Sequence, residues 1–137
     1  MLVQMQLSLP RDASYVPVTR SVASSLLTTM NVPDEASDDV QVALTEACAN
    51  VVRHAAGIDY RVSLAVGPEG CEVEVLDNGA GASALPEPPA DFLDTDAESG
   101  RGLFLMRALV DDFEFMREHD GTRLRLVKRW GYVEPPA

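Results

Sequence analysis

The chain has 137 residues and a formal net charge of −11, from 22 acidic against 11 basic side chains. This length fits one domain whose core needs no disulfide or metal. So acidic a chain is not expected to bind nucleic acid directly, because nucleic-acid binders normally present a basic face. No stretch approaches the roughly 18 apolar residues of a membrane span, and no signal peptide is visible. We therefore expect a cytoplasmic protein without membrane contact, formed by a single domain over residues 1–137.

The first part of the chain is predicted to form one strand and two helices. Alternating residues predict a strand over 2–9, ended by Pro10. As the first strand it is expected at a sheet edge, where it is a candidate contact with a second copy of the chain. Helices are predicted over 15–30 and 35–56. Much of the apolar side of the first helix is assigned to Val16, Val18, Val22, Leu26 and Met30.

The second half of the chain is predicted to be mostly strand. Alternation predicts a hairpin of strands at 60–66 and 71–76, joined by a turn rich in glycine. Beyond it we expect a helix, two further strands and a tail, at residues 102–110, 113–117, 122–128 and 130–137.

Residues between the hairpin and the last helix have a different character, because they are rich in proline and acidic side chains. A loop this long inside a compact domain is usually functional or disordered. We interpret it as a mobile lid over about residues 82–101, with a disordered insertion as the alternative. The domain core then covers about residues 2–128. The order β-α-α-β-β-lid-α-β-β predicts a two-layer α/β sandwich, with a mixed, largely antiparallel sheet and helices on one face.

The second predicted helix carries a polar stripe beside its apolar sector. Glu46, Asn50 and His54 are four residues apart and therefore lie along one side. The neighbouring apolar sector consists of Val40, Leu44, Ala47, Cys48, Val51 and Ala55. A solvated helix face is the commoner explanation of Glu-x-x-x-Asn alone. Cys48 and Cys71 have no clustered partners, so both are expected to be buried small apolar residues.

Three glycine-containing segments follow in the order Asp77-Asn78-Gly79-Ala80-Gly81, Gly100-Arg101-Gly102-Leu103 and Gly121-Thr122. Glycines after a strand let the backbone pass close to a ligand, although Asp-Asn-Gly is also a common turn. Free N–H groups at a helix start bind anions without lysine. The single lysine, Lys128, and the absence of a Gly-x-x-x-x-Gly-Lys-Ser/Thr segment exclude a P-loop.

Together, the four segments resemble the nucleotide-binding boxes of the ATPase superfamily shared by gyrase, Hsp90, histidine kinases and MutL (GHKL). Within it the chain most resembles the bacterial anti-sigma-factor serine/threonine kinases, over about residues 15–128. The resemblance implies a Bergerat-type ATP-binding fold that uses ATP and Mg²⁺. It implies that Glu46 is the general base, that Asn50 is the magnesium ligand and that Asp77 accepts a hydrogen bond from the adenine amino group. The other implied nucleotide-binding residues are Gly79, Gly81, Gly100, Arg101, Gly102, Leu103 and Thr122.

The resemblance also implies a function. An anti-sigma factor of this kind sequesters an alternative sigma factor as a homodimer and phosphorylates a Ser or Thr of an anti-sigma antagonist protein. Arg20 is a candidate partner contact, and His54 a candidate second layer behind Glu46 and Asn50. The alternative is a non-catalytic, ATP-dependent protein-binding module of the same fold, which a Glu46 variant would distinguish. A detached histidine-kinase catalytic domain ranks last, because no phosphoacceptor helix pair fits before residue 15.

Overall fold

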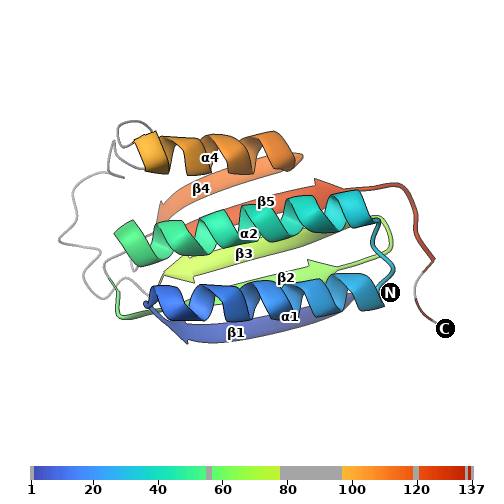
Figure 1. Ribbon diagram of the computed structural model, residues 1–137, viewed down its shortest axis with the longest axis horizontal. Coiled ribbons are helices and arrows are strands. Elements are labelled where there is room, and N and C mark those ends of the chain that lie inside the picture. Colours follow the sequence, from blue (N-terminus) through green and yellow to red (C-terminus); the bar gives the residue numbers. More distant parts are fainter. Residues whose placement is uncertain (1, 55–56, 78–96, 119–120, 135, 137) are drawn as a thin grey trace.

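The computed structural model describes residues 2–54, 57–77, 97–118, 121–134 and 136. One antiparallel sheet forms one layer, and the helices form a second layer on a single face of it (Figure 1). In chain order the elements are β1 (Val3–Pro10), η1 (Ala13–Tyr15), α1 (Val16–Thr29), α2 (Asp34–His54), β2 (Asp59–Val66), β3 (Gly70–Asp77), α4 (Ala97–Leu109), β4 (Asp112–Glu118) and β5 (Gly121–Arg129). The predicted two-layer sandwich is confirmed. None of the helices within these described ranges is long and apolar enough to cross a membrane.

The sheet has the strand order β1-β2-β3-β5-β4, and β1 lies at an edge as expected. All pairings among the described strands are antiparallel, so the prediction of a mixed sheet was wrong in this respect. The reason is the pair of helices between β1 and β2. A second helix brings the chain back to the end at which β1 stopped, where the Arg11 N–H donates to the Ile58 carbonyl at 3.0 Å. From there β2 can only run opposite to β1.

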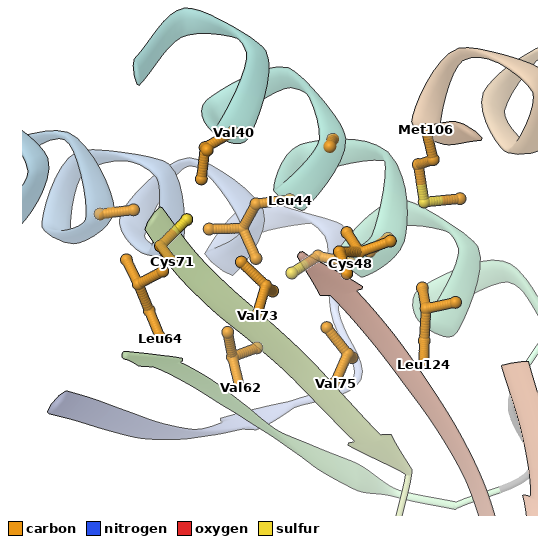
Figure 2. Packing of buried hydrophobic residues seen from close by; sticks show 14 of the residues in the cluster. Val40, Leu44, Cys48, Val62, Leu64, Cys71, Val73, Val75, Met106 and Leu124 are labelled. Carbon is orange, nitrogen blue, oxygen red and sulfur yellow. The ribbon is translucent and has the colours of Figure 1, made fainter. Parts of the chain in front are cut away.

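The core lies between the sheet and the helices (Figure 2). Alternate residues of the β2–β3 hairpin point into it, as predicted, because side chains of a strand alternate between its two faces. The core residues that the hairpin contributes are Tyr60, Val62, Leu64, Val66, Cys71, Val73 and Val75. On the opposite face, Glu72 and Glu74 form ion pairs with Arg125 and Arg123 of β5. The hairpin therefore has one apolar and one charged side.

Two details of the helices differ from the prediction. On α1, Val18 and Val22 are exposed by 47% and 36%, and the buried stripe contains Ala23 and Leu27 instead. This helix carries two apolar stripes, and periodicity alone does not say which one meets the sheet. On α4, the helix begins at Ala97 and not at residue 102. Of the predicted lid at about residues 82–101, residues 82–96 lie outside the described residues, and residues 97–101 belong to α4 and not to a loop.

The predicted tail is bound to the hairpin turn. The backbone and indole N–H groups of Trp130 donate to the carbonyls of Glu69 and Pro68, at 2.9 and 3.2 Å. Further along, the Val133 N–H donates to the Pro68 carbonyl at 2.8 Å. Trp130 also packs against the core cluster. The start of the tail therefore extends the packed domain beyond the predicted limit at residue 128.

Candidate functional site

Four elements meet at one end of the sheet. The C-terminal end of α2, the end of β3, the beginning of α4 and the beginning of β5 all lie at the left of Figure 1. These are the elements that carry the predicted site residues. The fold therefore gathers segments that are far apart in the sequence at a single edge.

On α2, the predicted polar stripe lies at the border of the buried sector. Glu46 is half-buried, and Asn50, one turn later, is only 2% exposed. The amide oxygen of Asn50 has no hydrogen-bond partner among the described residues. Most buried side-chain acceptors are satisfied, so this oxygen is available to a ligand. The predicted apolar sector of α2 is confirmed for Val40, Leu44, Ala47, Cys48 and Val51, whereas Ala55 lies outside the described residues.

Asp77 is the last residue of β3 and is 5% exposed. Neither of its carboxylate oxygens has a hydrogen-bond partner within the described part of the chain. A buried carboxylate without a donor is costly, so the site is built to receive one. On β5, the pairing of Leu76 with Arg123 makes Thr122 the next residue towards Asp77. Residues opposite each other in a sheet share a face, so Thr122 joins Asp77 on the side of the helices.

Gly102 of α4 lies directly against the α2 stripe. A Cβ atom on Gly102 would be 2.8 Å from Oε2 of Glu46 and 3.9 Å from Nδ2 of Asn50. The structure therefore brings Glu46, Asn50 and Gly102 together, as the order of the boxes suggested. Because α4 starts at Ala97, however, Gly100, Arg101 and Gly102 lie within the helix and not before it. The free N–H groups of a helix belong to its first four residues. In α4 these are residues 97–100, so Gly100 is among them, whereas Arg101 and Gly102 follow them.

The other predicted residues have mixed outcomes. Leu103 is 4% exposed and belongs to the core cluster, so its side chain packs α4 against the core. His54 is half-buried in the last turn of α2. Gly79 and Gly81 lie outside the described residues, so their predicted contact with a nucleotide remains a prediction.

Two buried hydroxyl groups near the site were not predicted. Tyr60 pairs with Asp77 across the hairpin, and Thr19 lies on the buried side of α1. Both neighbour Cys48 of α2, and neither hydroxyl has a hydrogen-bond partner of ordinary geometry among the described residues. Burial raises the pKa of the Cys48 thiol to about 12, although the two hydroxyls act in the opposite direction. The register of the hairpin pairs Tyr60 with Asp77 and would have identified this hydroxyl. The alternation of the strand gives only the face on which Tyr60 lies.

This arrangement can hold a ligand that brings both a hydrogen-bond donor and a cation. The donor would satisfy the Asp77 carboxylate, and the cation would satisfy the amide oxygen of Asn50. Mg²⁺ commonly takes only one or two protein oxygens, with phosphates and water as its remaining ligands. Glu46 is a carboxylate beside that cation position. The residues present therefore fit a nucleotide bound with magnesium.

Comparison with known proteins also points to a nucleotide-binding family. Residues 9–128 match the family described as the histidine kinase-like ATPase domain. The serine-protein kinase RsbW of Bacillus subtilis is 28% identical over 135 residues, which cover 90% of this chain and 84% of the relative. RsbW of Bacillus mycoides is 28% identical over 131 residues, covering 88% and 82%.

Two solved structures share the fold. The RsbU and RsbW domains of Rv1364c from Mycobacterium tuberculosis superpose with a TM-score of 0.66 at 19% identity, covering 96% of this chain and 35% of that one. The SiaB–SiaC complex from Pseudomonas aeruginosa gives a TM-score of 0.65 at 15% identity, covering 90% and 88%. The family match extends over most of the chain and includes Glu46, Asn50, Asp77, Gly102 and Thr122. The chain thus belongs to the histidine kinase-like ATPase domain family.

Proposed function

We propose that this chain binds ATP with Mg²⁺ at the end of the sheet where α2, β3, α4 and β5 meet. The observation that carries the proposal is the pair of buried acceptors, Asp77 and Asn50, which lack donors among the described residues. The adenine amino group is a donor of the kind that Asp77 lacks, and Mg²⁺ is a ligand for the Asn50 oxygen. Gly79, Gly81, Gly100, Arg101 and Thr122 are the further nucleotide contacts in this proposal.

We further propose that the chain is a protein serine/threonine kinase whose substrate is an anti-sigma antagonist protein. The hydroxyl oxygen of the acceptor Ser or Thr forms a bond to the γ-phosphorus, while the bond between that phosphorus and the β–γ bridging oxygen breaks and ADP leaves. Glu46 receives the hydroxyl proton as general base. The half-buried Glu46 one turn from Asn50, and the similarity to serine-protein kinase RsbW, support this step.

In the same proposal the chain sequesters an alternative sigma factor and acts as a homodimer. The edge strand β1 and helix α1 form an apolar groove lined by Val3, Met5, Val22 and Leu26. An unpaired edge beside exposed apolar side chains suits a second copy of the chain. Arg20, exposed on α1 in a groove lined by serine and threonine hydroxyls, remains the candidate contact for a protein partner.

A titration of the purified protein with ATP, with and without Mg²⁺, tests the binding site. In Asp77→Asn the new amide group presents its own donors where the adenine amino group needs an acceptor, so we expect at least a tenfold loss of affinity. Asp38→Asn is the matched control, because Asp38 is an exposed aspartate on α2. Unchanged affinity in Asp77→Asn, or no ATP binding by the wild-type protein, would refute the proposed site.

Glu46→Gln separates the kinase from a non-catalytic ATP-dependent binding module. With γ-labelled ATP and an added antagonist protein, the kinase proposal expects retained ATP binding and at least a hundredfold loss of transfer. The binding module predicts a different result. The wild-type protein would bind ATP and its partner without transferring phosphate, and Glu46→Gln would leave both binding affinities unchanged.

A further inference from the structure

We propose that Gly102 is a positioning residue for Glu46, because its lack of a side chain leaves the space that the Glu46 carboxylate occupies. This inference rests on the proposed kinase function and assigns to Gly102 a role other than holding phosphate. A Cβ atom at this position would lie 2.8 Å from Oε2 and 3.7 Å from Cδ of Glu46. The first of these distances is shorter than van der Waals contact allows. Only a glycine permits α4 to lie this close to the carboxylate.

The backbone of Gly102 gives no other reason for a glycine. Glycine is the weakest helix former apart from proline, and Gly102 lies inside α4, which begins at Ala97. The positive-φ glycine among the described residues is Gly121, so Gly102 does not need the conformational freedom of glycine. Its N–H group also lies beyond the first four of the helix, which are the ones free to bind an anion. The remaining reason for a glycine at position 102 is the close approach of α4 to α2.

The contact constrains the carboxylate more than it constrains the fold. The atom that a Cβ would meet is the far end of a flexible side chain, so an alanine at position 102 displaces the Glu46 carboxylate while both helices stay in place. Asn50 would be disturbed little, since its Nδ2 atom is 3.9 Å away, an ordinary contact distance. In Gly102→Ala the proposed metal ligand, Asn50, therefore keeps its position, whereas the carboxylate of the proposed base, Glu46, is displaced.

Such a displacement matters for proton transfer. A general base acts within about 2.6–3.2 Å of the proton it receives, and a misplacement of about 1 Å can cost about a hundredfold in rate. With Gly102 in place, α4 limits the positions of the Glu46 carboxylate from one side. The carboxylate then remains where it can take the proton of the acceptor hydroxyl as the oxygen bonds to the γ-phosphorus.

The test compares Gly102→Ala with Gly131→Ala, because a Cβ atom at Gly131 would meet no atom within 4 Å. For Gly102→Ala we expect a dissociation constant for ATP with Mg²⁺ within about threefold of wild type. The rate of phosphate transfer from γ-labelled ATP, measured at saturation in single turnover, should fall by about ten- to a hundredfold. Gly131→Ala should leave both quantities unchanged. In a Glu46→Gln background, adding Gly102→Ala should change the residual rate by less than about twofold, because the two positions act as one unit.

A tenfold loss of ATP affinity with an unchanged rate at saturation would overturn the inference in favour of a phosphate-binding glycine. An equal loss of rate in the Glu46→Gln background would overturn it too. A readout without nucleotide separates this inference from the proposed function. The ¹³C carboxyl resonance of Glu46, assigned by its loss in Glu46→Gln, should shift in Gly102→Ala and stay in place in Gly131→Ala. An unshifted resonance refutes the contact, whereas a shift in a protein without transfer activity refutes the kinase proposal and supports the contact.

Discussion

Replacing the single lysine, Lys128→Met, should destabilise the fold by releasing α4 from α2. Lys128 lies on β5 opposite Cys71, and its side chain reaches between the two helices. Its ammonium group donates to the Asp39 carboxylate of α2 at 3.0 Å and to the Leu109 carbonyl at the end of α4 at 2.8 Å. Methionine keeps most of the apolar stem and removes both hydrogen bonds. Asp39 and the Leu109 carbonyl then lose this donor.

The size of the effect follows from the partial burial of the pair. The side chains of Lys128 and Asp39 are 19% and 25% exposed. Each hydrogen bond to a charged group contributes about 1.5–3 kcal/mol, and partial access of water reduces the cost of breaking the pair. We expect a loss of about 2 kcal/mol. An unfolding entropy of about 2.1 cal/mol/K per residue then predicts a Tm about 7 °C lower for a domain of this size.

Thermal unfolding followed by circular dichroism measures this effect, with Arg129→Met as the control. Arg129 is the next residue on β5 and also forms an ion pair, with Asp112, but these two side chains are 61% and 52% exposed. An exposed pair contributes about 0–1 kcal/mol, so by the same conversion the control should lose about 3.5 °C or less. A Tm of Lys128→Met within about 2 °C of wild type, or equal losses in both variants, would refute the assigned role of the lysine.

Two further predictions concern Gly70 and the cysteines. A Cβ atom at Gly70 would lie 2.7 Å from the Lys128 carbonyl oxygen and 3.2 Å from the Arg129 Cα, which are both backbone atoms of the paired strand. Gly70→Ala should therefore lower the free energy of unfolding, measured in urea, by about 1–3 kcal/mol. Gly102→Ala should not cause such a loss, because its Cβ atom would meet only a mobile side chain. Burial raises the pKa of Cys48 and of Cys71 from 9.0 to about 12. The contribution of the two neutral thiols to stability is therefore full below about pH 9 and falls as the pH rises towards 12. Urea unfolding at pH 8 and at pH 10.5 measures this loss of stability, and the thiols of the folded protein should resist alkylation by iodoacetamide at pH 8.

The local periodicities predicted the parts of the fold that depend on neighbouring residues. The hairpin alternation identified the buried face of β2 and β3, and the helical period placed Leu44, Ala47 and Cys48 in the core. The same period put Glu46 and Asn50 on one side of α2, at the border of that core. These predictions succeeded because each compares residues at most a few positions apart, whose relative direction is determined by the backbone geometry.

Periodicity failed where two apolar patterns competed or where glycine was taken as a boundary. On α1 the stripe with Val22 and the stripe with Leu27 are both compatible with a helix, and only packing on the sheet selected Leu27. On α4 the glycines suggested a helix start, whereas the helix continues back to Ala97. Glycine disfavours a helix without forbidding it, so the packing against α2 decided the outcome.

The sequence by itself determined the order of the elements, the amphipathic faces and the presence of the boxes that indicate the family, since these are properties of short segments. The tertiary structure decided which of those residues meet. Gly102 contacts Glu46 across more than fifty residues, and Lys128 reaches Asp39 across 89. It also decided that Asp77 and Asn50 are buried without donors among the described residues. Contacts of this kind arise only when a sheet and its helices pack together, because no local pattern specifies the partner of a residue so far away in the chain.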